Sequence, residues 1–355
     1  RIKSEDFIVN DLPMAVKIYT DSKWFQTNFG GVMPLEIIVD TKKKNGLMRS
    51  VKPIAAIDEF SSYLDSSDAT ARPLSFVEGL KFAKQAFYDG DTLSYAIPYE
   101  SDLAFIGPYL KAKKDSAPTT GPNAFNRLIS NFIDSNKQKA RISVNMKDIG
   151  SAKLPELLAK FETKANQIFD RASYKISFTG SSVSFLEGSS FIINGLKESI
   201  FWAFLLISLC MLYLFKSIKI LFSSLIPNLI PLIVTAGVMG WAGIALKPST
   251  VLVFSVALGI VIDVTIRFLI NYKQELPSHQ NQVGPTLIQT IKHTGISIIY
   301  TSLVLIAGFI IFSFSDFGGT KALGWLTSLT LVVGTITNLV LLPVLILTIS
   351  GKKNG

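Results

Sequence analysis

The chain has 355 residues, of which 48% are hydrophobic and 17% charged, and its mean hydropathy is +0.39. These values exclude a purely soluble globular protein and indicate membrane-embedded segments. The charges are divided unevenly, because residues 1–196 hold 25 of the 35 Lys and Arg and 22 of the 26 Asp and Glu. The composition therefore changes near Gly195, and we expect different domains on its two sides.

Residue counts exclude several kinds of site. A single cysteine, Cys210, rules out a disulfide scaffold and a thiolate zinc site, and the two histidines, His279 and His293, leave too few ligands for a histidine-rich metal centre. No nucleophile, base and orienting residue occur together with catalytic spacing. We therefore expect neither an enzyme, nor a bound metal, nor a cofactor.

The first domain, residues 1–196, has the pattern of a small α+β fold. Runs rich in β-branched residues predict strands, and amphipathic runs after them predict helices. In chain order these are the strand Pro34–Asp40, a helix through Ile54, Ile57, Phe60 and Leu64, the strand Ala140–Met146, the helix Leu154–Phe169 and the strand Tyr174–Thr179. A polar loop is predicted at residues 112–123. Two strand–helix units and a returning strand predict a ferredoxin-like split βαβ layout.

The second domain, residues 197–349, has the pattern of a membrane bundle. A hydrocarbon core of about 30 Å needs about 20 apolar residues in a helix that rises about 1.5 Å per residue. Five runs meet this requirement: Ser199–Phe215, Ile220–Leu246, Thr250–Ile270, Ile296–Phe314 and Leu323–Ile349. We expect an all-α bundle of five transmembrane helices, and a helix from about Ser182 that continues into the first of them.

The lysines between these runs predict the orientation of the chain. The loops and the tail on one side of the predicted bundle contain six lysines: Lys216, Lys219, Lys273, Lys292, Lys352 and Lys353. The short loops on the other side contain only Lys247 and Lys321. By the positive-inside rule, the tail at residues 350–355 is cytoplasmic and residues 1–196 are extracytoplasmic. The excess of basic residues is therefore a topology signal, and we expect no nucleic-acid partner.

One acidic residue, Asp263, lies inside the third predicted span. A carboxylate within hydrocarbon is costly, so such residues face the bundle interior, become neutral or serve an ion pathway. Because burial away from water favours the protonated carboxyl, Asp263 is a candidate proton relay. The alternative is a structural ion pair with Arg267, four residues later, although Arg267 could instead reach the cytoplasmic surface.

Other polar residues interrupt the predicted spans. Asn228 stands between Pro227 and Pro231, where missing N–H groups predict a helix kink. Taken singly, such polar residues are typical of contacts that hold membrane helices together. As candidate neighbours of the relay we name Thr265, Thr301, Ser302 and Asn338.

A set of short motifs in the second half resembles the RND superfamily, and within it the MMPL-like and predicted-exporter branch. The motifs are Ile226-Pro-Asn-Leu-Ile-Pro231, Gly243-Ile-Ala-Leu, Ala257-Leu-Gly-Ile-Val-Ile-Asp-Val-Thr-Ile-Arg-Phe-Leu269, Tyr300-Thr-Ser and Gly308-Phe. In addition, Gly30–Asp40 is similar to the start of that family's porter domain. The order and spacing of the motifs cover residues 197–349.

The resemblance implies a specific architecture. Relatives have twelve spans in two similar halves, each with one span, a large extracytoplasmic loop and five further spans. The chain would then be a C-terminal half, with residues 1–196 as a periplasmic porter domain. An N-terminal RND half, on the same chain or a separate one, would complete it. The localisation implied is a multi-pass protein of the bacterial inner membrane.

The resemblance also places a proton relay on Gly259 and Asp263. Three departures bear on it: Val264 stands where relatives often have Tyr or a second Asp, Arg267 where they often have His, and Asn338 where some carry an acid in the last span. These departures leave open whether Asp263 or the complementary half supplies the principal proton site.

The sequence thus predicts a proton-driven RND-type secondary transporter that exports a hydrophobic or lipid-like substrate. Its expected partners are the lipid bilayer, that substrate, protons and the N-terminal half, while a homo-oligomer or a periplasmic partner stays open. The predicted porter domain is short, which argues against docking onto an outer-membrane channel. The alternative is a non-pumping RND-fold subunit that senses lipid or scaffolds an envelope assembly, with Asp263 and Arg267 held as a fixed pair.

Overall fold

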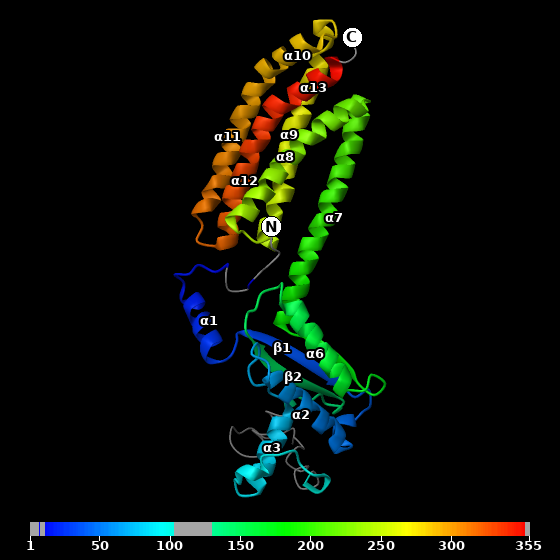
Figure 1. Ribbon diagram of the computed structural model, residues 1–355, viewed down its shortest axis with the longest axis vertical. Coiled ribbons are helices and arrows are strands. Elements are labelled where there is room, and N and C mark those ends of the chain that lie inside the picture. Colours follow the sequence, from blue (N-terminus) through cyan, green and yellow to red (C-terminus); the bar gives the residue numbers. More distant parts are fainter. Residues whose placement is uncertain (1–6, 8–10, 103–129, 352–355) are drawn as a thin grey trace. The chain divides into compact units, whose positions relative to one another are not determined.

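The structure is a computed structural model that describes residue 7, residues 11–102 and residues 130–351. The described chain forms two compact units (Figure 1), which we name the sheet unit (residues 15–188) and the helical unit (residues 11–14 and 189–351). The polar loop predicted at residues 112–123 and the two lysines predicted in the tail lie outside the described residues.

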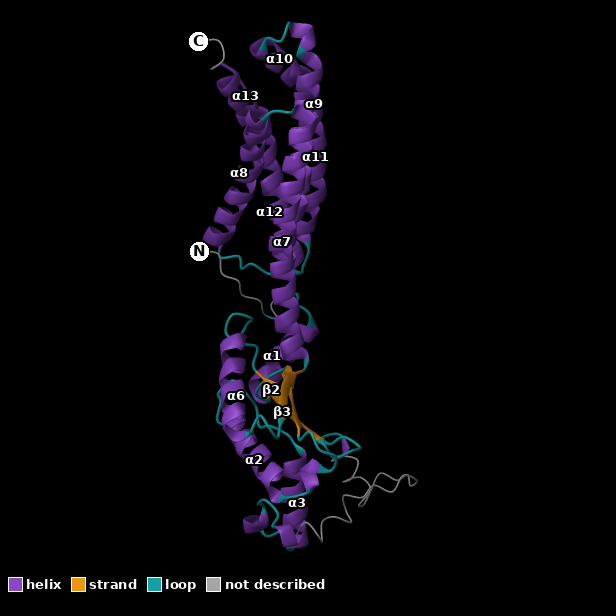
Figure 2. Cartoon of the chain, turned by 90° about the vertical axis from the view of Figure 1, so that its right-hand side faces the viewer, coloured by secondary structure: helices purple, strands orange, loops and turns teal. Residues whose placement is uncertain are grey.

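The sheet unit is built on a small antiparallel sheet, which appears in orange in Figure 2. Its elements are α1 (Lys17–Asn28), β1 (Met33–Asp40), α2 (Val51–Asp65), α3 (Phe76–Phe87), β2 (Lys139–Met146), α6 (Leu154–Ile168) and β3 (Lys175–Thr179). Both outer strands pair antiparallel with β1, in the order β2-β1-β3. The strands predicted from β-branched runs are therefore confirmed. Beyond them, Thr70 and Leu74 make isolated bridges to β2.

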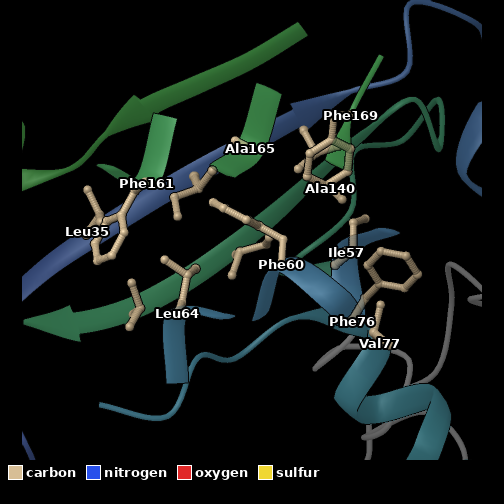
Figure 3. Packing of buried hydrophobic residues seen from close by; sticks show 14 of the residues in the cluster. Leu35, Ile57, Phe60, Leu64, Phe76, Val77, Ala140, Phe161, Ala165 and Phe169 are labelled. Atoms are coloured by element: carbon tan, nitrogen blue, oxygen red, sulfur yellow. The ribbon is translucent and has the colours of Figure 1, made fainter. Parts of the chain in front are cut away.

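The core of the sheet unit lies on one face of the sheet. Residues of β1 alternate between buried and half-buried, so that Leu35, Ile37 and Val39 point into the core, as the two-residue period of a strand requires. Figure 3 shows Phe60 from α2 and Phe161 from α6 among the side chains that meet this face. Amphipathic helices over one sheet face thus form this hydrophobic core, as their apolar periodicity predicts.

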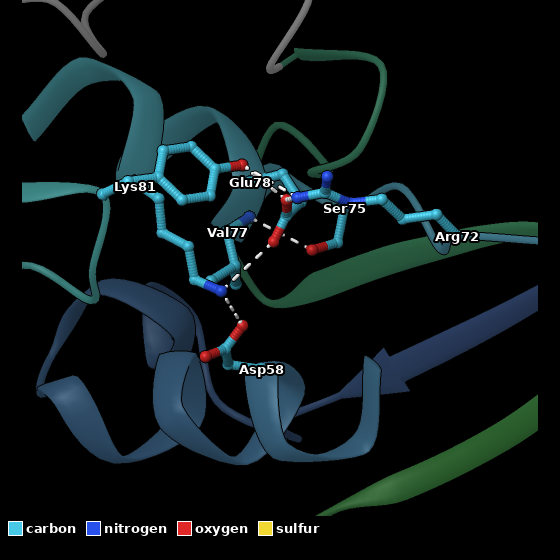
Figure 4. Close-up of polar contacts among 7 residues, drawn as sticks. Asp58, Arg72, Ser75, Val77, Glu78 and Lys81 are labelled. Carbon is cyan, nitrogen blue, oxygen red and sulfur yellow. Dashed lines mark hydrogen bonds and ion pairs between the residues drawn. The ribbon is translucent and has the colours of Figure 1, made fainter. Parts of the chain in front are cut away.

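A polar network joins α2 to α3 at the edge of that core (Figure 4). Its centre is Glu78, which accepts hydrogen bonds from the Tyr95 hydroxyl (2.6 Å) and the Arg72 guanidinium (2.7 Å). Lys81 donates to Glu78 (3.2 Å) and pairs with Asp58. Burial alone would raise the pKa of Glu78, but these hydrogen bonds and the charge of Lys81 hold it below its usual value.

The helical unit consists of long helices joined by short turns. These are α7 (Ser181–Phe215, which begins in the sheet unit), α8 (Ile218–Ala242), α9 (Pro248–Glu275), α10 (Val283–Thr290), the π-turn η5 (Ile291–Gly295), α11 (Ile296–Ile310), η6 (Ile311–Phe314), α12 (Gly318–Ile336), the π-turn η7 (Thr337–Leu341) and α13 (Leu342–Gly351). In the described residues, five stretches are long and apolar enough to cross a membrane. The predicted number of spans is confirmed.

Within the helical unit, α12 packs against α8, α9 and α11. Small residues allow this close approach, since a Cβ on Gly334 would lie 2.6 Å from a methyl group of Val261 in α9. The constraint is tighter at Gly324, where a Cβ would lie 2.6 Å from the backbone nitrogen of Ser313 and 2.8 Å from the carbonyl oxygen of Phe309. Glycine at these positions brings the helix backbones into direct contact.

We expect replacement of Glu78 by Gln to destabilise the polar network around α3 by about 1–3 kcal/mol at neutral pH, since charged hydrogen bonds from Arg72, Tyr95 and Lys81 are lost. Because the pKa of Glu78 is lowered on folding, its contribution is present above the unfolded value near 4.5 and disappears as pH falls further. Hydrogen exchange of the α3 peptide, corrected for intrinsic rates, should therefore separate wild type from variant at pH 7, and the difference should shrink as the pH falls below the unfolded value. Glu156→Gln, which removes an exposed pair with Lys160, is the matched control.

We expect Gly324→Ala to separate α11 from α12, because the added methyl group meets backbone that cannot rotate away. Gly308→Ala is the matched control, since a Cβ there meets nothing within 4 Å and alanine favours the helix. Thermal unfolding of the purified chain in detergent should show a loss of about 1–3 kcal/mol for the first variant alone. Equal stability of the two variants would contradict this account of the helix contact.

Candidate functional site in the helical unit

Helix α9 presents two chemically different faces. Thr265 and Phe268 are fully buried, whereas Gly259, Asp263 and Arg267 are exposed on the described bundle. This division follows from helix geometry, because side chains two positions apart point in nearly opposite directions and side chains four apart share a face. The acid and the buried threonine of α9 therefore belong to separate sites.

The outward face carries the predicted relay. Asp263 lies near the middle of α9 and forms an ion pair with Arg267 one helical turn away. The side chains are 52% and 48% exposed, so neither is enclosed by the described helices. Among the described residues, the side chain of Asp263 has one polar contact, which is with Arg267. The structure thus brings together two of the residues that the sequence assigned to the relay.

The inward face carries a buried polar cluster formed by Asn228 of α8, Thr265 of α9 and Asn338 of η7, which we name the amide cluster. The hydroxyl oxygen of Thr265 lies 2.7 Å from Asn228 Oδ1 and 2.5 Å from Asn338 Oδ1. All three residues are at most 1% exposed. Residues far apart in the sequence therefore meet at one point inside the helical unit.

Irregular backbone surrounds the amide cluster. Helix α8 continues through Pro227 and Pro231, but Pro231 has no N–H to bond the carbonyl of Pro227. That carbonyl instead accepts a hydrogen bond from the hydroxyl of Thr337 at 3.0 Å. Thr337 and Asn338 open the π-turn η7, a local widening of the helix that recurs at functional sites. The freed carbonyl finds its partner on a neighbouring helix, as expected for proline in a membrane helix.

The remaining predicted neighbours lie elsewhere. Thr301 of α11 donates to the carbonyl oxygens of Ser297 and Ile298 in its own helix, at 3.1 Å each. Ser302 is buried, and Gly259 has open space where a Cβ would stand. Sequence reasoning missed the Thr235–Thr330 pair, whose hydroxyls lie 2.6 Å apart between α8 and α12. Isolated threonines in apolar runs carry no signal of such pairing.

The sheet unit contains a second candidate, a pocket of about 380 Å³ between α6 and β3. Its lining combines the basic side chains Lys42, Arg171 and Lys175 with the aromatic rings of Phe169 and Tyr174. Two of its cations already have partners, because Lys42 donates to the carbonyls of Arg171 (2.7 Å) and Ala172 (3.1 Å), and Arg171 donates to Asn166 (2.9 Å). Two of the three basic side chains of this pocket are thus already hydrogen-bonded, and we therefore take the helical unit as the candidate site.

The profile of the MMPL family matches residues 111–354, which is more than half of the chain and includes all of α8 to α13. No curated protein matches the chain. The match confirms the resemblance that the motifs of the second half indicated. Members of the family are transporters rather than enzymes. With this match and five helices able to cross a membrane, the chain belongs to the MMPL family, whose members are RND-type membrane transporters.

Proposed function

We propose that the chain is the C-terminal half of a proton-driven transporter that exports a hydrophobic or lipid-like substrate across or out of the bacterial inner membrane. The observation that carries the proposal is the position of Asp263, near the middle of a spanning helix and on its outward face. Membership of the MMPL family supports the transporter class. Beyond the transporter class, we propose a type of substrate and a coupling ion.

A charged face at this depth argues for a covering partner. The exposed stripe of α9 continues from Asp263 and Arg267 to the apolar residues Leu252, Val256 and Ile270. Charged side chains that face lipid at mid-membrane are costly, whereas those inside a bundle are tolerated. Gly259, one turn before Asp263, leaves room for close approach of another helix. We propose that the N-terminal half covers this stripe and encloses the relay.

Proton binding would then act on a specific ion pair. Protonation of Asp263 removes its negative charge and releases Arg267, so the electrostatic balance of the enclosed face changes. A proton that moves through the membrane potential supplies about 2.3 kcal/mol per 100 mV. This energy is comparable to the few kcal/mol that separate two packing states of a helix bundle. The relay could therefore bias a conformational cycle.

The orientation of the chain is also part of the proposal. Asp11 pairs with Lys247 at 2.7 Å, and its carbonyl oxygen accepts from the backbone N–H of Gly318 at 3.3 Å. The chain before the sheet unit therefore contacts the bundle end that the lysine pattern assigns to the periplasm. At the other end, Lys273 donates to the carbonyl oxygen of Leu214 at 2.7 Å, near the last turn of α7. We assign the sheet unit to a periplasmic porter domain.

A second candidate function rests on the same ion pair. If Asp263 and Arg267 remain paired throughout, the chain would be a non-pumping RND-fold subunit that senses lipid or scaffolds an envelope assembly. Their separation of four residues, with the acid first, is the arrangement that stabilises a helix. In that case the pair could be replaced by neutral residues without loss of function.

We expect Asp263→Asn to abolish export while insertion into the membrane stays normal, because the amide cannot exchange a proton. The measurement is growth or substrate export in the native host, with the variant in the complete transporter and with membrane insertion checked by fractionation. Asp316→Asn, in the turn before α12, is the matched control and should keep wild-type activity.

The double variant Asp263→Asn with Arg267→Gln separates the two candidate functions. For a relay, the double variant stays inactive, since the proton site is still missing. For a structural pair, removal of both charges restores what the single variant loses, because no unpaired arginine remains. Wild-type export by Asp263→Asn alone would contradict both the relay and the proposed proton coupling at this residue.

A further inference from the structure

The pocket between α6 and β3 has an apolar floor that the core of the sheet unit leaves open. In the register of β1 and β3, Ile176 lies opposite Val39. Two residues later, Phe178 lies opposite Ile37, and residues opposite each other point to the same face of a sheet. The two β1 residues are fully buried, whereas the two β3 residues are half-buried and line the pocket together with the ring of Phe169 (Figure 3). The helices over the sheet therefore leave apolar surface of β3 uncovered.

Arg171 lies at the rim of this pocket, in the turn between α6 and β3. Its Nε donates to Asn166 Oδ1 of α6 at 2.9 Å. A guanidinium has five N–H groups, and this bond uses one of them. Within the described part of the chain, the two terminal nitrogens of Arg171 make no hydrogen bond or ion pair. The bond to Asn166 thus orients the side chain, while the end that matches a carboxylate or phosphate stays available.

Lys42 supplies a second oriented cation. Its ammonium donates to the carbonyl oxygens of Arg171 at 2.7 Å and Ala172 at 3.1 Å, which leaves one of its three N–H groups. These neutral carbonyls hold the ammonium in place but do not cancel its charge. Lys175, the third cation of the lining, lies opposite Asp40 in the strand register, which offsets part of its charge. We therefore assign the recognition of an anion to Arg171 and Lys42.

Tyr174 adds a neutral donor beside these cations. Its ring contacts that of Phe169, with the ring centroids 5.4 Å apart, and among the described residues its hydroxyl has no hydrogen-bond partner. Burial raises the pKa of Tyr174, so the hydroxyl keeps its hydrogen at neutral pH. The lining thus combines aromatic and aliphatic surface with donors that remain unused.

We propose that this pocket binds an amphiphile with an anionic phosphate or carboxylate head group. The head would contact Arg171 and Lys42, and the hydrocarbon chain would cover the floor formed by Ile176 and Phe178. The volume of about 380 Å³ provides room for such a ligand, since small-molecule sites measure about 300–1,000 Å³. A free anion would use the cations alone and leave the apolar floor in water, so the floor favours a head group that carries a chain.

Binding at this pocket does not depend on the proposed transport activity. The residues that it uses belong to the sheet unit, whereas Asp263 belongs to the helical unit. A lipid-like substrate with an anionic head group would suit both the cations and the floor. That link between the pocket and export is the part that rests on the proposed function.

The test is isothermal titration of hexyl phosphate, a soluble anionic amphiphile, into the full chain in phosphatidylcholine nanodiscs, with empty nanodiscs as the blank. Inorganic phosphate and ethyl phosphate represent the free anion, and hexanol represents the chain alone. We expect hexyl phosphate to bind most tightly, with a gain of about fourfold for each methylene group that the floor covers fully. Equal affinity for inorganic phosphate would overturn the amphiphile, equal affinity for hexanol would overturn the anionic head, and no binding of hexyl phosphate would overturn the site.

Matched variants assign the binding to the pocket. Arg171→Gln should weaken the binding of hexyl phosphate by about tenfold, because a charged two-point contact is lost. Arg49→Gln makes the same change of charge at an exposed position outside the lining and should bind as wild type. An equal loss of affinity in the two variants would contradict the assignment.

A variant with the opposite sign covers the case in which Arg171→Gln disturbs the turn. Glu162 is the acidic residue of the lining and is exposed on α6, so its carboxylate repels an anion in the pocket. Glu162→Gln should therefore bind hexyl phosphate more tightly than wild type does, and unchanged or weaker binding would count against the site.

The two proposals fail in different experiments. If hexyl phosphate does not bind while Asp263→Asn still abolishes export, the pocket is overturned and the proposed proton path stands. If hexyl phosphate binds as expected while Asp263→Asn exports at the wild-type rate, the pocket stands and proton coupling at Asp263 is overturned.

Discussion

Hydrocarbon offers no hydrogen-bonding partner, so every polar group within the spans depends on another protein group. This constraint explains why the hydroxyls of Thr235 and Thr330 meet between two helices and why Thr337 bonds the carbonyl that Pro231 releases. It also explains the glycines of α12, since close backbones are needed before short side chains can reach across a helix boundary. Packing and polar pairing in the helical unit are therefore two results of one requirement.

The same constraint is met in different ways on the two faces of α9. Polar groups on the inner face are buried by α8 and η7, and their uncharged oxygens contact one another. The charges on the outer face neutralise each other within one helix turn but remain about half exposed. A neutral pair reduces the cost of facing lipid without removing it, because each ion still loses hydration. The inner face is thus complete within this chain, whereas the outer face requires something beyond the described bundle.

Much of the fold follows from periodicity and could be predicted. Alternation along Met33–Asp40 and long apolar runs after Gly195 identify strands and spans, since burial imposes a period of two on a strand and a minimum length on a membrane helix. Helix α1 was not predicted, because its aromatic residues Trp24 and Phe25 are exposed and form no apolar face toward the core. The π-turns were not predicted either, since hydrophobicity does not record a change of hydrogen-bond register.

For the candidate site, the sequence identifies the residues but not their grouping. Asn228 and Asn338 are more than one hundred residues apart, and only the packing of α8 against η7 brings them together. The separation of Thr265 from Asp263 could have been predicted, because about 100° of rotation per residue places them on nearly opposite faces of a helix. Polar residues that are close to an acid in the sequence therefore need not belong to the same site as the acid. When a helix has a charged face and a neutral polar face, the two faces can serve different partners: the neutral face of α9 packs on α8 and η7, and the charged face is left for a partner outside the described bundle.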